Sequence, residues 1–329
     1  MFASISQDCP DVISLARGLN MHLIQPTSFF QLQVDCCNVV SVTCDTNSSR
    51  VTGIGWSNLN GTINGTALPG SLTVFTISPG INRVGGPIPN TLPNNMTYVG
   101  LNGNKINGSI PNTLPSSLSA FYLSQNRLSG TLPSVYPAGL KYFWVNGNSL
   151  TGELSTTLPT LFSELGVNDN KLTGSLPDFS GWANLRVIFL FNNLVAGDVP
   201  DLMMLSKMQT FNVKNNLLTG QLYSFPESVI NIDVGNNHFR GPVPLVPRTI
   251  LNLLMSSNAF TGTLIVNNPT QLMIKGNLIS GLILNNTGSL TVCDISNNPL
   301  LGYPGILNLT MCSQSGLFLD SFTSVNIGN

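Results

Sequence analysis

The feature that most constrains this chain is a repeated pair of residues, an Asn followed four positions later by a Gly. The pair recurs at intervals of 19 to 23 residues along the 329-residue chain. Such a period is typical of solenoid proteins, in which each coil buries its apolar face only by stacking on its neighbours. It predicts about eleven to twelve coils, and the pairs start at Asn82, Asn104, Asn126, Asn148, Asn170, Asn193, Asn216, Asn237, Asn258, Asn277 and Asn298.

Within each unit, apolar residues stand five and three positions before the Asn, as Phe121 and Leu123 do before Asn126. This period of two predicts a short strand whose apolar side chains face the core. The Asn amide is expected to bond backbone groups of neighbouring coils, and the Gly to allow a positive φ or a close contact between coils. Pro79 stands where a core residue of the Asn82 unit belongs, which predicts a broken or irregular strand there.

Charge is scarce in this chain. Only 8% of the residues are charged, the formal net charge is −1, and 42% are hydrophobic. The apolar content excludes intrinsic disorder, and the missing positive charge makes nucleic acid an unsuitable partner. No apolar run approaches the ~18 residues of a membrane-spanning helix, so no membrane insertion is expected. The first residues lack a signal-peptide pattern, and we expect such a segment to have been removed or omitted.

The cysteines and the glycosylation sequons together indicate an oxidising, extracellular compartment. The cysteine spacing does not match the paired ligands of a zinc site, so we expect disulfides and no metal. The six cysteines are Cys9, Cys36, Cys37, Cys44, Cys293 and Cys312. The candidate N-glycosylation sites are Asn47, Asn60, Asn64, Asn95, Asn107, Asn285 and Asn308.

The repeat resembles a known family. The segments 121–133 and 165–177 are similar to the plant-type extracellular leucine-rich repeat (LRR) of polygalacturonase-inhibiting proteins and LRR receptor ectodomains. The segment from Cys36 to Asp45 resembles the amino-terminal cap of those arrays. The resemblance implies an LRR solenoid with short parallel β-strands on a concave face, an irregular or 3-10 convex side and a disulfide cap at each end. It also implies the bridges Cys9–Cys36, Cys37–Cys44 and Cys293–Cys312.

The same reasoning divides the chain into three parts. Residues 1–50 are expected to form the cysteine cap, with a helical segment and a first strand, and residues 51–302 the LRR units. Residues 303–329 are expected to form a carboxy-terminal cap and tail. The sequence leaves open whether the tail, residues 316–329, docks on the last coil, crosses to another molecule or extends freely.

The strand positions that alternate with the core residues point onto the concave face, and aromatic residues gather there. Neighbouring strands lie ~4.8 Å apart, which places Tyr122 beside Trp144. Exposed aromatics with few charges suit a protein partner or a sugar ring, although stacking that only stabilises the sheet is an equally good reading. The candidate ligand-binding residues are Tyr98, Tyr122, Tyr142, Trp144, Glu164, Asp169, Phe189 and Phe191. A sparser polar group, expected to be solvated, comprises Lys214, Asp233, Lys275 and Asp294.

No catalytic motif is present, and the two His are far apart, so we expect neither an enzyme nor a cofactor. The first hypothesis is a secreted LRR glycoprotein, bearing N-linked glycans, that recognises an extracellular protein or polysaccharide on its concave aromatic face. The alternative is a structural glycoprotein that assembles with copies of itself into filaments or a wall layer, because low net charge removes the usual repulsion. Ice binding, known for some relatives of this repeat, ranks third because no regular Thr array is found.

Overall fold

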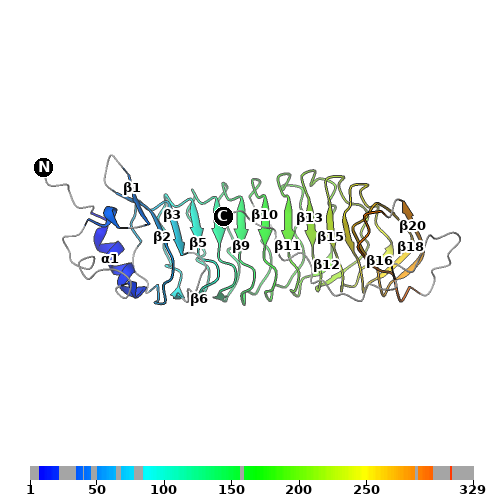
Figure 1. Ribbon diagram of the computed structural model, residues 1–329, viewed down its shortest axis with the longest axis horizontal. Coiled ribbons are helices and arrows are strands. Elements are labelled where there is room, and N and C mark those ends of the chain that lie inside the picture. Colours follow the sequence, from blue (N-terminus) through cyan, green and yellow to red (C-terminus); the bar gives the residue numbers. More distant parts are fainter. Residues whose placement is uncertain are drawn as a thin grey trace. The chain divides into compact units, whose positions relative to one another are not determined.

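The computed structural model describes residues 7–21, 35–39, 41–45, 50–63, 68–77, 84–155, 159–285, 288–298 and 312. The chain divides into two compact units, each treated by itself below. Unit 1 comprises Met1–Pro177 and Gly181–Leu185, and unit 2 comprises Asp178–Ser180 and Arg186–Asn329. Each unit is a β-solenoid in which successive coils follow one another in chain order (Figure 1).

The main sheet of unit 1 receives one strand from each coil. Its strands are parallel except for β1, which runs antiparallel to β2. In spatial order they are β1 (Val42–Cys44), β2 (Val51–Trp56), β3 (Val74–Ile77), β5 (Tyr98–Gly100), β7 (Ala120–Tyr122), β9 (Tyr142–Trp144) and β10 (Glu164–Gly166).

The main sheet of unit 2 is parallel throughout the described residues. In spatial order its strands are β11 (Val187–Phe189), β13 (Thr210–Asn212), β15 (Asn231–Asp233), β17 (Asn252–Leu254), β19 (Gln271–Met273) and β21 (Val292–Asp294).

The side of the coils opposite the main sheet is mostly irregular but adds short parallel sheets. Within the described residues, unit 1 has one such sheet, of β4 (Gly85–Pro87), β6 (Lys105–Gly108) and β8 (Arg127–Leu128). The described part of unit 2 has two, formed by β12 (Ala196–Asp198) with β14 (Leu217–Thr219), and by β16 (Arg240–Pro242), β18 (Ala259–Asn267) and β20 (Leu278–Asn285).

The repeated Asn bonds the coils to one another, as the pattern predicts. In Asn126, Oδ1 accepts a hydrogen bond from the backbone N–H of Ile106 at 2.9 Å, and Nδ2 donates to the carbonyls of Leu101 at 2.9 Å and Leu123 at 3.0 Å. The same arrangement recurs at Asn148 and in unit 2 at Asn237. Each amide thus satisfies backbone groups that the turn leaves unpaired, a necessity for buried polar groups.

The paired Gly adopts a positive φ, for example +80° at Gly152. The residue before the repeated Asn also has a left-handed backbone, a feature that the sequence pattern did not reveal. In units without a Gly at this position it is a polar residue, such as Gln125 (φ 56°) or Asn215 (φ 54°). Asn and Asp tolerate this region better than other non-Gly residues.

The interior of each unit is filled by the alternating apolar residues and by stacked Phe rings. Phe121 and Phe143 in unit 1 have ring centroids 5.8 Å apart, and Phe239 and Phe260 in unit 2 are 5.9 Å apart. The expectation of a broken strand in the Asn82 unit was wrong. Strand β3 pairs with β2 and β5, and it ends at Ile77, before the position of Pro79. Pro79 and Asn82 themselves lie outside the described residues.

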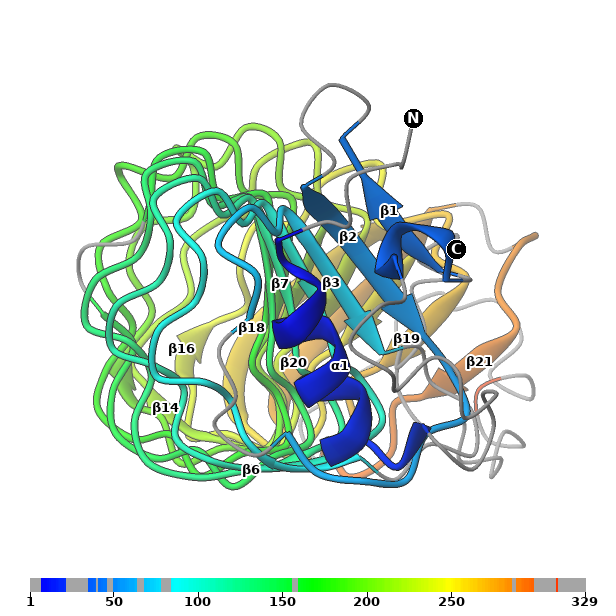
Figure 2. The same ribbon diagram turned by 90° about the vertical axis from the view of Figure 1, so that its left-hand side faces the viewer.

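A small cap closes the amino-terminal end of unit 1. Helix α1 (Cys9–Gly18) lies across the end of the first coils (Figures 1 and 2), and the Gly18 carbonyl accepts a hydrogen bond from the Thr62 N–H at 2.7 Å. The 3-10 helix η3 (Cys36–Asn38) follows. The expected pairings are confirmed, since Cys9–Cys36, Cys37–Cys44 and Cys293–Cys312 form disulfides.

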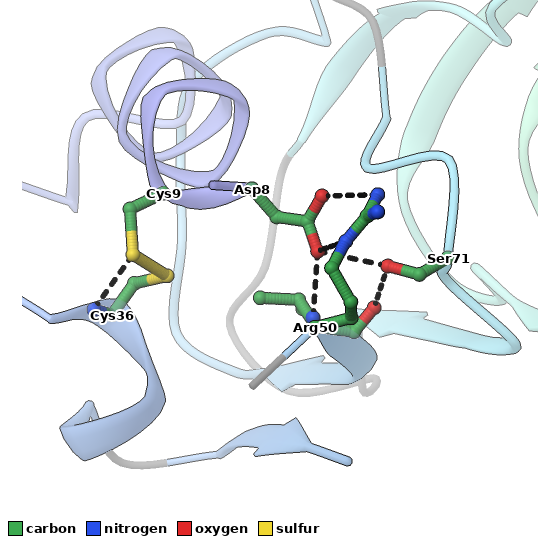
Figure 3. Close-up of polar contacts among 6 residues, drawn as sticks. Asp8, Cys9, Cys36, Arg50 and Ser71 are labelled. Carbon is green, nitrogen blue, oxygen red and sulfur yellow. Dashed lines mark hydrogen bonds and ion pairs between the residues drawn. A yellow bond between two sulfur atoms is a disulfide. The ribbon is translucent and has the colours of Figure 1, made fainter. Parts of the chain in front are cut away.

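One carboxylate fastens this cap to the first coils. The Asp8 side chain, 4% exposed, accepts hydrogen bonds from Arg50 Nε (2.8 Å), Val51 N (2.8 Å) and Ser71 Oγ (2.9 Å), as Figure 3 shows. Burial by itself raises the pKa of Asp8, but these hydrogen bonds and the Arg50 charge outweigh it, so that the pKa is lowered. Asp8 is therefore ionised and acts as a structural anchor.

Candidate functional site

We define the strand face of a unit as the surface of its main sheet that points away from the core. In unit 1 the register brings the outward residues into two rows across the strands. The first row is Val74, Tyr98, Ala120, Tyr142 and Glu164. The second row is Thr76, Gly100, Tyr122, Trp144 and Gly166.

Four of these residues, Tyr98, Tyr122, Tyr142 and Trp144, form what we call the aromatic strip. The rings of Tyr98 and Tyr122 are 5.5 Å apart with a 42° tilt, and those of Tyr122 and Tyr142 are stacked at 6.4 Å. Tyr98 is 36% exposed, and Tyr122 and Tyr142 are half-buried. The rings therefore stabilise one another and still present a partly open surface.

Trp144 is held by its neighbours. It pairs in register with Gly166, and its indole ring occupies the space in which a Cβ on Gly166 would stand. Its Nε1 donates a hydrogen bond to Oε2 of Glu164 at 3.2 Å. Trp144 is 9% exposed, so it forms the floor of the strip, and the tyrosines form its accessible part. Sequence reasoning overlooked Gly166, although a Gly at a strand position beside an aromatic residue signals such a close approach.

Two tyrosines of the strip, Tyr98 and Tyr122, have a raised pKa and remain neutral phenols. Burial raises the pKa of Tyr98. Burial also raises the pKa of Tyr122, and the nearby Glu164 carboxylate adds to this effect. The hydroxyl groups of Tyr98 and Tyr122 can therefore both donate and accept hydrogen bonds at physiological pH.

The remaining predicted residues differ from expectation. Asp169 lies at a left-handed turn position (φ 53°) and accepts a hydrogen bond from Asn168 Nδ2 at 2.6 Å, which gives it a structural role. Phe189 and Phe191, in unit 2, were expected to be exposed. That expectation was wrong, because they are only 3% and 4% exposed and pack edge to face with centroids 6.1 Å apart.

The polar group on the strand face of unit 2 is also less solvated than expected. Lys275 and Asp294 form an open ion pair at 3.7 Å. Asp233, in contrast, is 3% exposed, and burial raises its pKa to about 6 despite a backbone hydrogen bond from Gly235. The expectation of a solvated carboxylate at Asp233 was therefore wrong.

Four candidate glycosylation sites lie within the described residues, and all four side chains are exposed: Asn60, Asn95, Asn107 and Asn285. Asn47, Asn64 and Asn308 lie outside the described residues, as does the tail 316–329. Exposure is compatible with glycosylation, which stays a prediction.

Cys9, Asp35 and Cys36 offer three potential metal-binding atoms within 4.8 Å of one another, but the two sulfurs are joined in a disulfide and so provide no thiolate ligand. Among the described residues, no helix is long and apolar enough to cross a membrane, and α1 has only 10 residues.

Comparison with known proteins identifies the fold. No protein-family model and no curated protein matches the sequence. Among solved structures, the LRR ectodomain of the Arabidopsis thaliana receptor kinase GASSHO1/SCHENGEN3, in complex with CASPARIAN STRIP INTEGRITY FACTOR 2, has a TM-score of 0.72 at 20% identity, over 88% of this chain and 41% of that one. The Arabidopsis receptor kinase HAESA, in complex with the peptide hormone IDA and the co-receptor SERK1, has a TM-score of 0.53 at 22% identity, over 89% and 66%.

A plant ice-binding protein is also similar, with a TM-score of 0.60 at 21% identity, over 78% of this chain and 88% of that one. The chain thus spans less than two thirds of the two receptor structures and most of the ice-binding protein. These likenesses show that the chain has the LRR solenoid fold found in plant ectodomains.

Proposed function

We propose that this chain is a non-enzymatic, secreted LRR glycoprotein that recognises an extracellular ligand with the aromatic strip of unit 1. The observation that carries the proposal is the partly exposed stack of Tyr98, Tyr122 and Tyr142 on a rigid strand face. Aromatic anchors held in one conformation lose little entropy on binding, which suits them to recognition. The three disulfides support an extracellular location.

Of the two ligand classes, a polypeptide fits the aromatic strip better than a polysaccharide does. Two similar structures contain receptor ectodomains in complex with partners, one of them a peptide hormone. Neutral phenol groups beside the single carboxylate of Glu164 also suit the mixed apolar and amide surface of a peptide. Sugar rings stacking on Tyr98 remain the second ligand class.

The proposal is tested with the glycosylated protein immobilised on a biosensor and exposed to panels of secreted peptides and of cell-wall polysaccharides. A ligand so found should bind at least tenfold more weakly to the double variant Tyr122→Ala/Trp144→Ala, because the accessible ring of Tyr122 and the Trp144 ring that forms the floor of the strip are both lost. Trp144→Phe, which keeps the packing against Gly166, guards against a general folding defect. Tyr223→Ala, at a residue 72% exposed in unit 2, is the matched control. Equal affinity of the double variant and the wild type would reject the proposal.

Self-assembly is the second candidate, and one observation favours it. In unit 2, on the side opposite the main sheet, four apolar side chains from successive coils are 47–76% exposed: Tyr223, Leu245, Ile265 and Ile283. Ile265 and Ile283 pair in register, and the N–H of Leu245 donates to the Tyr223 carbonyl. Light scattering of the glycosylated protein over a hundredfold concentration range tests assembly, with Leu245→Lys/Ile265→Lys expected to abolish it.

Thermal hysteresis of the same samples tests ice binding, the third candidate.

A further inference from the structure

The aromatic strip of unit 1 ends beside a single carboxylate. Glu164 is the outward residue of β10 in the first row, and it pairs in register with Tyr142 of β9. It is the one charged residue in the two outward rows of β3, β5, β7, β9 and β10. Glu164 is half-buried, so its charge is only partly hydrated. A negative group therefore adjoins the rings on an otherwise uncharged surface.

This carboxylate has no counter-charge among the described residues. Its Oε2 accepts a hydrogen bond from the Trp144 indole N–H at 3.2 Å, and no described residue donates to Oε1 or forms an ion pair with the group. Lys141 contacts Glu164 through its backbone, since its carbonyl accepts from the Glu164 N–H at 3.1 Å, and its side chain is exposed. One oxygen of Glu164 is thus open to a cation from outside the chain.

The neighbouring rings offer a surface on which a cation binds well. Tyr122 stacks on Tyr142 with an interplanar angle of 19°, and the register places Glu164 on the other side of Tyr142. Among the described aromatic residues, no other ring stacks on Tyr142. A Lys or Arg cation is attracted to an aromatic face within about 6 Å of the ring centroid. A cation on the free face of Tyr142 would also lie beside Glu164, because adjacent strands are about 4.8 Å apart.

The phenol oxygens favour the same kind of ligand. Burial is the largest cause of the raised pKa of Tyr122, and the charge of Glu164 and the phenols of Tyr98 and Tyr142 raise it further. The Tyr122 hydroxyl therefore lies in the field of several negative groups. Partial burial strengthens this field, since the local dielectric constant is lower than that of water.

Neutral and acidic ligand groups fit this end of the strip less well. A neutral group that covered it would bury the Glu164 carboxylate without a counter-charge, which is costly. An acidic group would be repelled by the same charge. Charge complementarity thus selects a positively charged group.

We propose that the aromatic strip takes a Lys or Arg side chain of a polypeptide ligand, with the cation on the Tyr142 ring and paired with Glu164. This inference rests on the proposed function of the strip and names the group that the strip selects. The phenol ring and the carboxylate act together, so that each contributes to the preference for a charged side chain.

A titration followed by fluorine NMR tests this pairing in the full-length, disulfide-bonded protein. Labelling with 5-fluorotryptophan gives three probes, of which Trp144 contacts Glu164. The ligands are acetylated and amidated pentapeptides with Arg, citrulline, Lys or norleucine at the third position and Gly at the other four. Citrulline and norleucine are close in size to Arg and Lys but carry no charge.

The Trp144 resonance should shift saturably with the Arg and Lys peptides. Their dissociation constants should be at least about fivefold lower than those of the neutral peptides, because an ion pair and a contact between cation and ring are gained. The Trp56 and Trp182 resonances should stay in place, which shows that the fold is unchanged. Equal affinities of charged and neutral peptides, or dissociation constants above about 10 mM for all of them, would overturn the inference.

Substitutions separate the roles of charge and ring. Glu164→Gln should reduce the preference for Arg over citrulline to about twofold or less, and its amide oxygen can still accept the Trp144 N–H. Glu153→Gln is the matched control, because it removes the same charge at an exposed position outside the strip. Tyr142→Leu should weaken binding of the Arg peptide at least about threefold, whereas Tyr142→Phe keeps the ring and should not. A preference that persists in Glu164→Gln would overturn the inference.

The variant Tyr122→Ala distinguishes failure of this inference from failure of the proposed function. If charged and neutral peptides bind equally and Tyr122→Ala weakens both, the strip binds peptides without selecting a cation, and the inference alone is overturned. If the Arg peptide binds Tyr122→Ala and Tyr142→Leu as tightly as the wild type, the strip is not the binding site, and both are overturned.

Discussion

At the scale of single residues, two buried aspartates respond to their surroundings in opposite ways. Asp8, in unit 1, receives three hydrogen bonds and the charge of Arg50, and its pKa is lowered. Asp233, in unit 2, keeps one oxygen without a partner among the described residues, and burial raises its pKa to about 6. The Asp8 contribution to stability is therefore present above the unfolded pKa and is lost as the pH falls, whereas protonated Asp233 favours folding at low pH.

The prediction at this scale concerns Asp233→Asn. A carboxyl whose folded pKa exceeds its unfolded value contributes stability below about pH 4, and this contribution is lost as the pH rises through 6. The shift corresponds to about 3 kcal/mol, as an order of magnitude. Urea unfolding at pH 4, 5, 6 and 7 should show that Asp233→Asn gains stability relative to the wild type as the pH rises. Asp294→Asn, at a half-exposed carboxylate on the same face, is the control. A constant difference between Asp233→Asn and wild type would contradict the assignment.

At the scale of the strand, the aromatic strip depends on small residues next to large ones. Trp144 lies over Gly166 of the adjacent strand, and Tyr98 lies over Gly100 of its own strand. The repeat pattern indicates which positions face outward, but not that two of them must lack a side chain. That requirement appears only when neighbouring coils are set in register.

The prediction for the strand is that Gly166→Ala displaces the Trp144 ring, because the added Cβ would collide with it. Overpacking of this kind typically costs about 1–3 kcal/mol. Trp56 and Trp182 are at most 3% exposed, so a red shift of emission and greater acrylamide quenching should report Trp144. Gly139→Ala, where an added Cβ meets no atom within 4 Å, should change neither quantity. Unchanged emission of Gly166→Ala would contradict this prediction, because it would mean that the Trp144 ring moves aside without becoming exposed to solvent.

At the scale of the whole molecule, a solenoid must protect the apolar ends of its stack. In unit 1 the cap provides this protection through α1, the Asp8 anchor and two disulfides. The Cys9–Cys36 bridge spans 27 residues and the Cys37–Cys44 bridge spans 7. In the chain-entropy model the longer loop contributes more, because its closure restricts the unfolded chain more strongly.

We accordingly predict that Cys9→Ser/Cys36→Ser lowers the free energy of unfolding by about 3–4 kcal/mol and Cys37→Ser/Cys44→Ser by about 2 kcal/mol. Calorimetry of both double variants, under the same oxidising conditions, measures the order. A larger loss from the shorter loop would mean that local packing of η3 matters more than loop closure.

The sequence by itself determined the repeat, the strand positions, the role of the recurring Asn and, through a family resemblance, the disulfide pairing. These properties depend on local spacing, so they can be read from one unit at a time. Tertiary structure alone decided which outward residues are exposed: Tyr98 is open, whereas Phe189, Phe191 and Asp233 are covered. Exposure depends on what lies above a side chain and on which coil adjoins it, and those contacts join residues twenty or more positions apart. A period of two specifies the face on which a residue lies but not what covers that face.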